Sequence, residues 1–273
     1  MLFLFCVSIV ALLFFGMLYA IAPNHSRDYS DFKGRMYAHR GLHQPGVPEN
    51  SMAAFKLAVE GGYGVELDVQ FTKDHHIVVF HDANLKRMCG VNKRVRDCTY
   101  EELQGYRLQD TDQTIPLFTD VLEVLGETTL ICEIKNHNGN RNNRLCRETY
   151  EALCRYKGKY CIESFSPFLV GWFRNNHPEV IRGQLSCAMK DEGGLGYVAR
   201  LALSQLFINC ISRPDFIAYR HQDYRQPGFY ICSKLYHPLL VAWTARGNEE
   251  QNEAWKRFDA VIFELYANPH PVE

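Results

Sequence analysis

The sequence predicts a TIM-type (β/α)8 barrel with one hairpin after its second strand and one inserted segment, preceded by a single transmembrane helix. Three observations support this fold class. Apolar runs of strand length alternate with segments of helical periodicity along the chain. The length of 273 residues suits one barrel of this type, which usually takes about 250 residues. The first segment, residues 1–22, is apolar and carries no charge.

The number of strands decides the architecture. Nine segments have the length and composition of β-strands: 36–39, 64–70, 77–81, 129–135, 160–164, 182–186, 216–219, 240–244 and 260–264. A barrel of this type needs eight. The gap between 64–70 and 77–81 is too short for a crossover helix, so these two segments are predicted to pair as an antiparallel hairpin. Eight strand–helix units then remain.

The hairpin has a predicted register. With a two-residue turn in the middle of residues 73–76, counting back along both strands brings Asp68 opposite His81. A histidine would therefore sit directly across from a carboxylate.

Helix and loop signals account for the rest of the chain. Ser51 is a good helix N-cap and Gly61-Gly62 a good helix end, which predicts a helix between them. Residues 83–116 form a long polar stretch. We expect this stretch to be an insertion over one mouth of the barrel, because long loops usually carry function.

Residues 1–22 are predicted to be a transmembrane anchor. An apolar helix of this length, at about 1.5 Å per residue, can cross a hydrocarbon core of about 30 Å. A secretory signal would have a basic start and a cleavable site, but Ala20-Ile21-Ala22 is followed by Pro23. A buried core helix is the other alternative, and the extreme amino-terminal position disfavours it.

The domain organisation follows from this anchor. Residues 23–34 are interpreted as a polar linker, and residues 35–273 as the barrel domain. No Lys or Arg precedes the apolar segment, whereas Arg27, Lys33 and Arg35 follow it, so the positive-inside rule predicts a cytoplasmic barrel. We expect a single-pass protein of the cell membrane.

Composition limits the possible partners. The 30 basic and 31 acidic residues give a formal net charge of -1, so no overall positive field indicates nucleic-acid binding. No segment indicates an obligate protein partner. The 10 cysteines lack the paired spacing of metal sites, and several lie in apolar strand-like runs. We interpret them as reduced thiols in a reducing compartment, although an even number also permits disulfides.

Titratable residues cluster at four predicted strands, namely His39, Arg40, Glu66, Asp68, His81, Glu133 and Lys135. Side chains two positions apart share one face of a strand, so Glu66 lies beside Asp68, and Glu133 beside Lys135. An exposed face is an alternative for Glu66 and Asp68, but their apolar neighbours favour the barrel interior. Three converging carboxylates repel one another and lose hydration unless a hard divalent cation neutralises them. The sequence therefore predicts one bound Ca2+ or Mg2+.

The same stretches resemble the glycerophosphodiester phosphodiesterase family. The shared motifs are His39-Arg40-Gly41, Glu49-Asn50-Ser51, Glu66-Leu67-Asp68-Val69, Thr72-Lys73-Asp74, His81-Asp82, Ile115-Pro116 and Glu133-Ile134-Lys135. Any one fragment is weak, but their ordered combination is highly specific. Weaker similarities follow at Ser164-Phe165 and Trp243-Thr244. The last strand departs from the family, because Phe263-Glu264 stands where members often have a Thr-Asp-x-Pro-like turn.

The resemblance implies metal-dependent hydrolysis of a small glycerophosphodiester, or of a lysoglycerophospholipid, to glycerol 3-phosphate, or a lysophosphatidic acid, plus an alcohol. Phosphodiester cleavage needs a base, an acid and positive charge around the phosphoryl oxygens. The implied residue roles are metal binding by Glu66, Asp68 and Glu133, acid–base catalysis by His39 and His81, phosphate binding by Arg40 and Lys135, and substrate contact by Trp243.

Simpler alternatives remain for several residues. Lys135 could serve simply as an ion-pair partner of Glu133, and Trp243 could serve simply as a packing residue of the barrel. The basic run from Arg87 to Arg96 could be a solvated loop instead of a lipid-headgroup site. The other histidines are expected to be structural or surface residues: His43, His137, His177, His221, His237 and His270. Rival functions are a phospholipase-D-like or phosphoinositide-type diesterase on the same barrel, and a membrane-tethered inactive binding protein.

Overall fold

The computed structural model describes the chain except for residues 25–26, 138–142, 191–195 and 266–273. Eight parallel strands form a closed barrel, because β1 pairs with β9 on one side and with β2 on the other. The strands are β1 (Met36–His39), β2 (Gly64–Phe71), β4 (Leu130–Ile134), β5 (Tyr160–Ser164), β6 (Arg182–Ser186), β7 (Phe216–Arg220), β8 (Leu239–Arg246) and β9 (Ala260–Glu264). The predicted fold class is confirmed.

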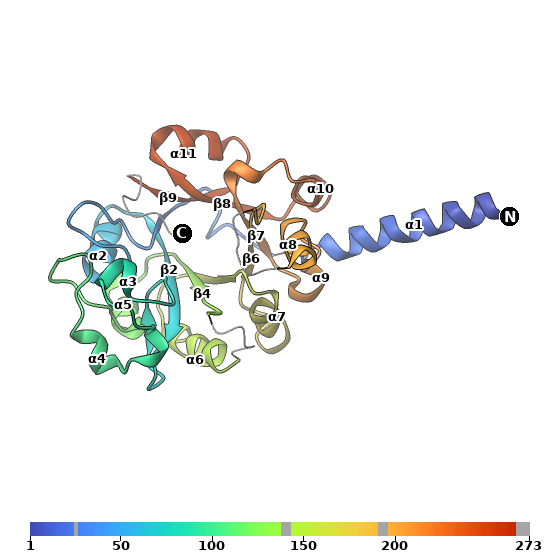
Figure 1. Cartoon of the computed structure of the whole chain (residues 1–273). Helices are drawn as coiled ribbons and strands as arrows, with labels where there is room; N and C mark the ends of the chain where they lie inside the picture. Colours follow the sequence, from blue (N-terminus) through green and yellow to red (C-terminus); the bar gives the residue numbers. More distant parts are fainter. Residues whose placement is uncertain (25–26, 138–142, 191–195, 266–273) are drawn as a thin grey trace.

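Helices surround this barrel (Figure 1). They are α2 (Met52–Glu60), α5 (Phe118–Leu125), α6 (Asn143–Leu153), α7 (Pro167–Asn176), α8 (Tyr197–Ser204), α9 (Asn209–Ser212), α10 (Pro227–Tyr236) and α11 (Gly247–Trp255), with the 3-10 turn η2 (His221–Asp223) before α10. The predicted cap of α2 is present, since the Ser51 hydroxyl accepts a hydrogen bond from the Ala54 N–H at 3.2 Å.

The strands divide their side chains between two apolar layers. Residues such as Val65, Leu67 and Ala38 face outward and pack under the helices. Residues at the alternate positions, such as Tyr37 and Ile131, fill the barrel interior. This alternation follows from the two-residue period of a strand. The interior is apolar at the amino ends of the strands and polar at their carboxyl ends, which positions the site at the carboxyl mouth.

The predicted hairpin exists, but its register was predicted wrongly by one residue. The short strand β3 (Ile77–Val79) runs antiparallel to the end of β2, with Val69 opposite Val79. Phe80, not His81, therefore lies across from Asp68, and its N–H donates to the Asp68 main-chain carbonyl at 3.0 Å.

The loop of the hairpin explains this shift. Thr72 donates its N–H to the His76 carbonyl at 3.0 Å, so three residues separate the paired positions instead of two. His75, the last of the three, has a left-handed φ of 64°. A residue in this conformation is typical of three-residue hairpin loops.

The predicted insertion forms a small lobe beside the hairpin. It contains α3 (Lys86–Cys89), the 3-10 turn η1 (Val95–Asp97) and α4 (Tyr100–Gln104), and Figure 1 shows α3 and α4 next to α2 and α5. Val78 and Phe80 of the hairpin share a separate apolar cluster with this lobe. Val79, which lies between Val78 and Phe80, points the other way and packs into the outer layer of the barrel. The alternation of side chains along the hairpin therefore contributes to two cores, that of the lobe and that of the barrel.

The segment predicted to be a linker packs against the amino end of the barrel. Phe32 is 4% exposed and belongs to the interior cluster with Tyr37 and Phe216. Asn24 donates its N–H to the Pro214 carbonyl at 2.8 Å and its Nδ2 to Asp215 at 2.6 Å. The described part of residues 23–34 therefore closes the floor of the barrel.

One described helix is long and apolar enough to cross a membrane. This helix, α1 (Leu2–Ile21), projects away from the barrel as a separate rod (Figure 1). Most of its large apolar side chains are exposed, whereas Ile21 at its end is fully buried against the barrel domain.

The floor contact generates a stability prediction. Phe32→Ala should lower the free energy of unfolding by about 3–5 kcal/mol, because it leaves a cavity in the barrel interior. Urea unfolding of the full chain in detergent measures the change. Phe168→Ala is the matched control, since Phe168 is 42% exposed, and it should change stability by less than about 1 kcal/mol. Equal effects of the two substitutions would contradict a structural role for the floor.

Candidate active site at the carboxyl end of the barrel

Three predicted carboxylates meet inside the barrel mouth. Glu66 and Asp68 lie on β2 and Glu133 on β4, and the parallel register brings Asp68 opposite Glu133. One carboxylate oxygen from each of the three lies within 4.8 Å of the others. All three side chains are buried. The sequence prediction that they share one face of the barrel interior agrees with this arrangement.

Two cations lie among these carboxylates. Lys135 Nζ is 2.8 Å from Asp68 Oδ1 and 2.7 Å from Glu133 Oε2. Arg40 Nε is 3.4 Å from Asp68 Oδ2, and the Arg40 main-chain N–H donates to Glu66 Oε2 at 3.1 Å. Lys135 thus forms the ion pair with Glu133 that the simpler alternative expected, and it also pairs with Asp68.

Burial and neighbouring charges shift the pKa values of the three carboxyl groups in different directions. Burial, together with the charge of Asp68, raises the pKa of Glu66 well above its usual value. Burial also raises the pKa of Glu133, to about 7. Asp68 behaves oppositely, because the charges of Lys135 and Arg40 outweigh its burial and hold its pKa well below the usual value. A hard divalent cation would favour ionisation of all three, so these residues fit such a cation.

Both predicted histidines are held by carboxylates. His39 Nδ1 is 2.6 Å from Glu264 Oε1, and its Nε2 is 3.9 Å from Glu66 Oε2. His81 Nδ1 is 2.7 Å from Asp82 Oδ1. An ionised carboxylate only accepts hydrogen bonds, so each Nδ1 carries a proton and donates it, which leaves Nε2 as the acceptor in the neutral ring.

The protein environment keeps both rings neutral. Burial, assisted by Arg40 and Lys135, lowers the pKa of His81 to about 3. Burial and Arg40 also lower the pKa of His39, against the opposing effect of Glu264. Each histidine therefore has a lone pair on Nε2 near neutral pH.

An ion-pair network fixes Arg40. The Glu49 carboxylate accepts a hydrogen bond from Arg40 at 2.7 Å and from Arg87 at 2.6 Å, and Arg87 also donates to Asp82 at 2.7 Å. The network links the inserted lobe to the acceptor that orients His81. Glu49 stood in a recognised motif, but the sequence did not indicate its role. Arg87, which could have been only a solvated basic residue, is half-buried in these pairs.

Two further carboxylates were missed by the sequence prediction. Glu264 orients His39, although the sequence marked its position only as a departure from the family. Glu163 lies opposite Glu133 in the pairing of β4 with β5, and burial and Glu133 raise its pKa well above the usual value. Both residues face the barrel interior from the end of an otherwise apolar strand. That pattern was the available signal.

Two histidines expected to be structural also lie at the site. His43 Nε2 is 3.8 Å from Glu264 Oε1, and His137 Nε2 donates to the His81 carbonyl at 2.7 Å. His137 continues the two-residue period of Glu133 and Lys135, which the sequence prediction overlooked. Of the other histidines, His177 stacks on Tyr150, and His221 begins η2 directly after β7. His237 is the C-cap of α10, and His270 lies outside the described residues.

Trp243 lies on β8 and packs edge-on against Phe165, with ring centroids 5.6 Å apart. Trp243 therefore packs against another side chain of the barrel, as the simpler alternative expected. Its indole Nε1 is buried and has no hydrogen-bond partner within the part of the chain that the structure describes.

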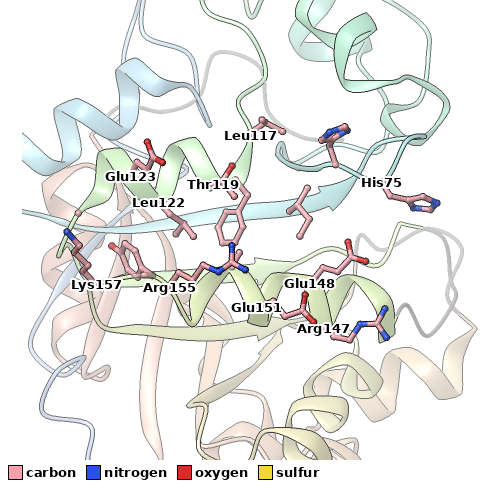
Figure 2. Close-up of a pocket in the computed structure, with 16 residues that line it drawn as sticks. His75, Leu117, Thr119, Leu122, Glu123, Arg147, Glu148, Glu151, Arg155 and Lys157 are labelled. Carbon is pink, nitrogen blue, oxygen red and sulfur yellow. The ribbon is translucent and has the colours of Figure 1, made fainter.

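A cavity of about 320 Å³ adjoins the site, lined by Lys135 and His137 together with Arg94 and Arg96 of the lobe. A larger groove of about 850 Å³ lies on the outer side of the barrel between α5 and α6 (Figure 2). Its charged side chains have both signs, and none of the predicted site residues lines it. The predicted site residues lie instead at the carboxyl mouth, where the barrel gathers the ends of its strands.

The cation site generates a binding prediction. Glu66→Gln, Asp68→Asn and Glu133→Gln should each weaken Ca2+ or Mg2+ binding by more than the ~10–100-fold typical of losing an outer hydrogen-bond partner. Calorimetric titration measures this. Glu163→Gln is the matched control, because Glu163 lies opposite Glu133 on the next strand but does not belong to the cluster of converging carboxylates. Unchanged affinity in the three variants would refute the site.

Similarity to known proteins agrees with the geometry. Residues 39–178 match the glycerophosphoryl diester phosphodiesterase family. Lysophospholipase D GDPD1 of Rattus norvegicus is 38% identical over 149 residues, which cover 50% of this chain and 46% of the relative. A glycerophosphodiester phosphodiesterase of Caldanaerobacter subterraneus is 39% identical over 114 residues, covering 39% of this chain and 46% of the relative. The aligned regions thus span just under half the length of these relatives.

Solved structures share the barrel fold. A phosphodiesterase of Oleispira antarctica in complex with the product sn-glycerol-3-phosphate has a TM-score of 0.69 at 21% identity, over 85% of this chain and 93% of the other. A glycerophosphodiester phosphodiesterase of Thermotoga maritima has a TM-score of 0.63 at 23% identity, over 88% and 96%. With the family match extending over half of its length, this chain belongs to the glycerophosphoryl diester phosphodiesterase family.

Proposed function

We propose that this chain hydrolyses glycerophosphodiesters, or lysoglycerophospholipids, to glycerol 3-phosphate, or a lysophosphatidic acid, and an alcohol. The family and the similarity to enzymes named lysophospholipase D and glycerophosphodiester phosphodiesterase support this reaction class. The observation that carries the proposal is the meeting of two carboxylate-held imidazoles with a buried carboxylate trio at one barrel mouth.

His39 and His81 are the proposed acid–base pair. One neutral imidazole accepts the proton of the attacking oxygen on Nε2, and the other, once protonated, donates a proton to the oxygen of the leaving alcohol. A phosphodiester brings negative charge next to these rings, which favours protonation of the acid. The hydrogen bonds from Nδ1 to Glu264 and Asp82 hold the rings in position for both transfers.

Positive charge for the phosphoryl group has two proposed sources. Glu66, Asp68 and Glu133 would hold one Ca2+ or Mg2+, which supplies Lewis-acid stabilisation of the phosphoryl oxygens when bound. Arg40 and Lys135 lie beside the same carboxylates and can donate hydrogen bonds to phosphoryl oxygens.

The remainder of the substrate would lie along the mouth. The unpartnered indole N–H of Trp243 suits an oxygen of the leaving group or of the glycerol. The cationic cavity of Lys135, Arg94 and Arg96 suits an anionic substrate. We therefore propose Trp243 as a substrate-binding residue.

In the proposed organisation, residues 1–22 are a membrane anchor and residues 35–273 are the catalytic domain, with its insertion at about 83–116. Residues 23–34 connect the two, and their described part closes the barrel floor. An apolar helix of this length and exposure supports the anchor. The basic residues that follow it support a cytoplasmic barrel. A membrane-bound enzyme of this kind would meet lipid-derived substrates directly.

The test is release of glycerol 3-phosphate from glycerophosphocholine, and of lysophosphatidic acid from lysophosphatidylcholine, by the full chain in detergent. Activity should disappear on chelation and return with Ca2+ or Mg2+. His39→Ala and His81→Ala should each abolish turnover, a loss of at least ~10²-fold, without altering thermal unfolding. Activity that survives exhaustive chelation would contradict the metal proposal, and cyclic phosphate products would favour the phosphoinositide-type alternative.

Glu264 should act as a positioning residue. Glu264→Gln removes the charged acceptor of His39 Nδ1, so the ring can adopt the wrong tautomer, and we expect kcat to fall by about 10-fold or more while KM changes little. The pH profile of kcat should shift as well, because the carboxylate favours protonation of His39. Glu249→Gln on exposed α11 is the control. A loss confined to stability would show that Glu264 is only structural.

A further inference from the structure

The end of α1 is fastened to the barrel domain by side-chain hydrogen bonds. Asn209, Arg213 and Tyr236 donate to main-chain carbonyls in and just after the last turn of α1, at distances between 2.6 and 2.9 Å. The last carbonyls of a helix lack the usual partner four residues on, so these donors bind groups at the helix end that are open to hydrogen bonding. The direction in which α1 leaves the barrel is therefore set by α9, its cap and α10.

The helices at the base of α1 carry exposed apolar side chains. Figure 1 shows α8, α9 and α10 gathered at the base of the α1 rod. The exposed apolar residues of these three helices, here called the α8–α10 face, are Tyr197, Val198, Leu201, Ile211, Tyr230 and Leu235. Tyr197 and Val198 are 74% and 78% exposed, which is unusual for apolar residues that begin a helix on a barrel.

The charged side chains on the helices of this region have one sign. Helices α7, α8, α9 and α10 contain no Asp or Glu, whereas Arg174, Arg200 and Lys234 lie on them. Helix α11, by contrast, contains three Glu residues within Gly247–Trp255. A surface that joins exposed apolar and tyrosine side chains with cations is complementary to anionic lipid headgroups and the boundary of the acyl chains.

The level of the membrane surface is marked by Tyr19 and Arg213. The Arg213 guanidinium lies 4.2 Å from the centroid of the Tyr19 ring. Tyrosine is typical of the boundary between lipid and water, and arginine can extend its charge into the headgroups there. A bilayer crossed by α1 and bounded at Tyr19 would lie against the side of the barrel that carries α8, α9 and α10.

We propose that the α8–α10 face rests on the surface of an anionic lipid bilayer and that the fastened end of α1 holds it there. This inference depends on the proposed membrane anchoring of α1. Because α8 follows β6, whose carboxyl end opens into the mouth of the barrel, the β6 side of the mouth then lies nearest the lipid. A lipid-derived substrate would enter the site from that side.

The test uses the full chain reconstituted into vesicles of phosphatidylcholine with phosphatidylglycerol. The photoreactive residue p-benzoylphenylalanine replaces Val198 in one variant, Leu12 of α1 in a second, and Val59 on the exposed surface of α2 in a third. After illumination, mass spectrometry measures lipid adducts. We expect adducts at Val198 to exceed those at Val59 several-fold and to fall when phosphatidylglycerol is omitted.

The controls separate the two proposals. A missing adduct at Leu12 would refute the membrane anchor and, with it, the docking of the face. An adduct at Leu12 with Val198 no more labelled than Val59 would overturn the α8–α10 inference alone. Crosslinks from Val198 to a second copy of the chain, in place of lipid, would also overturn it and identify the face as a dimer surface.

Discussion

Electrostatic repulsion among Glu66, Asp68 and Glu133 is the constraint around which the barrel mouth is organised. Burial removes the water that would screen these carboxylates, so their charge must be offset by the protein, by protonation or by a cation. Lys135 and Arg40 offset part of it, which keeps Asp68 ionised while the pKa values of Glu66 and Glu133 rise. The remaining imbalance is what a divalent cation would relieve.

The two histidines at the mouth depend on a second set of carboxylates. Glu264 and Asp82 each hold one imidazole by Nδ1, and burial beside Arg40 keeps both rings neutral. Glu49 joins Arg40 to Arg87 of the inserted lobe, and Arg87 returns to Asp82. The lobe is therefore connected to the carboxylate that orients His81, although its own apolar core lies outside the barrel.

The amino-terminal part of the chain is integrated with the domain that follows it. Phe32 fills the floor of the barrel, and the last turn of α1 accepts hydrogen bonds from residues more than 180 positions away. A helix that ended in a free tether would leave the barrel able to rotate against a membrane. Under the proposed membrane anchoring, a fastened helix would keep one side of the barrel toward the lipid and so link the fold to access of substrate.

The sequence by itself determined the barrel, the trio and the histidine pair, because strand count, two-residue alternation and ordered motifs are local properties of the chain. The hairpin register depended on the left-handed backbone of His75, one conformational choice that composition does not reveal. Only the tertiary structure brought Glu264 to His39, since the two residues are 225 positions apart and meet when β9 pairs with β1. Closure of the barrel, a property of all eight strands together, decided that contact.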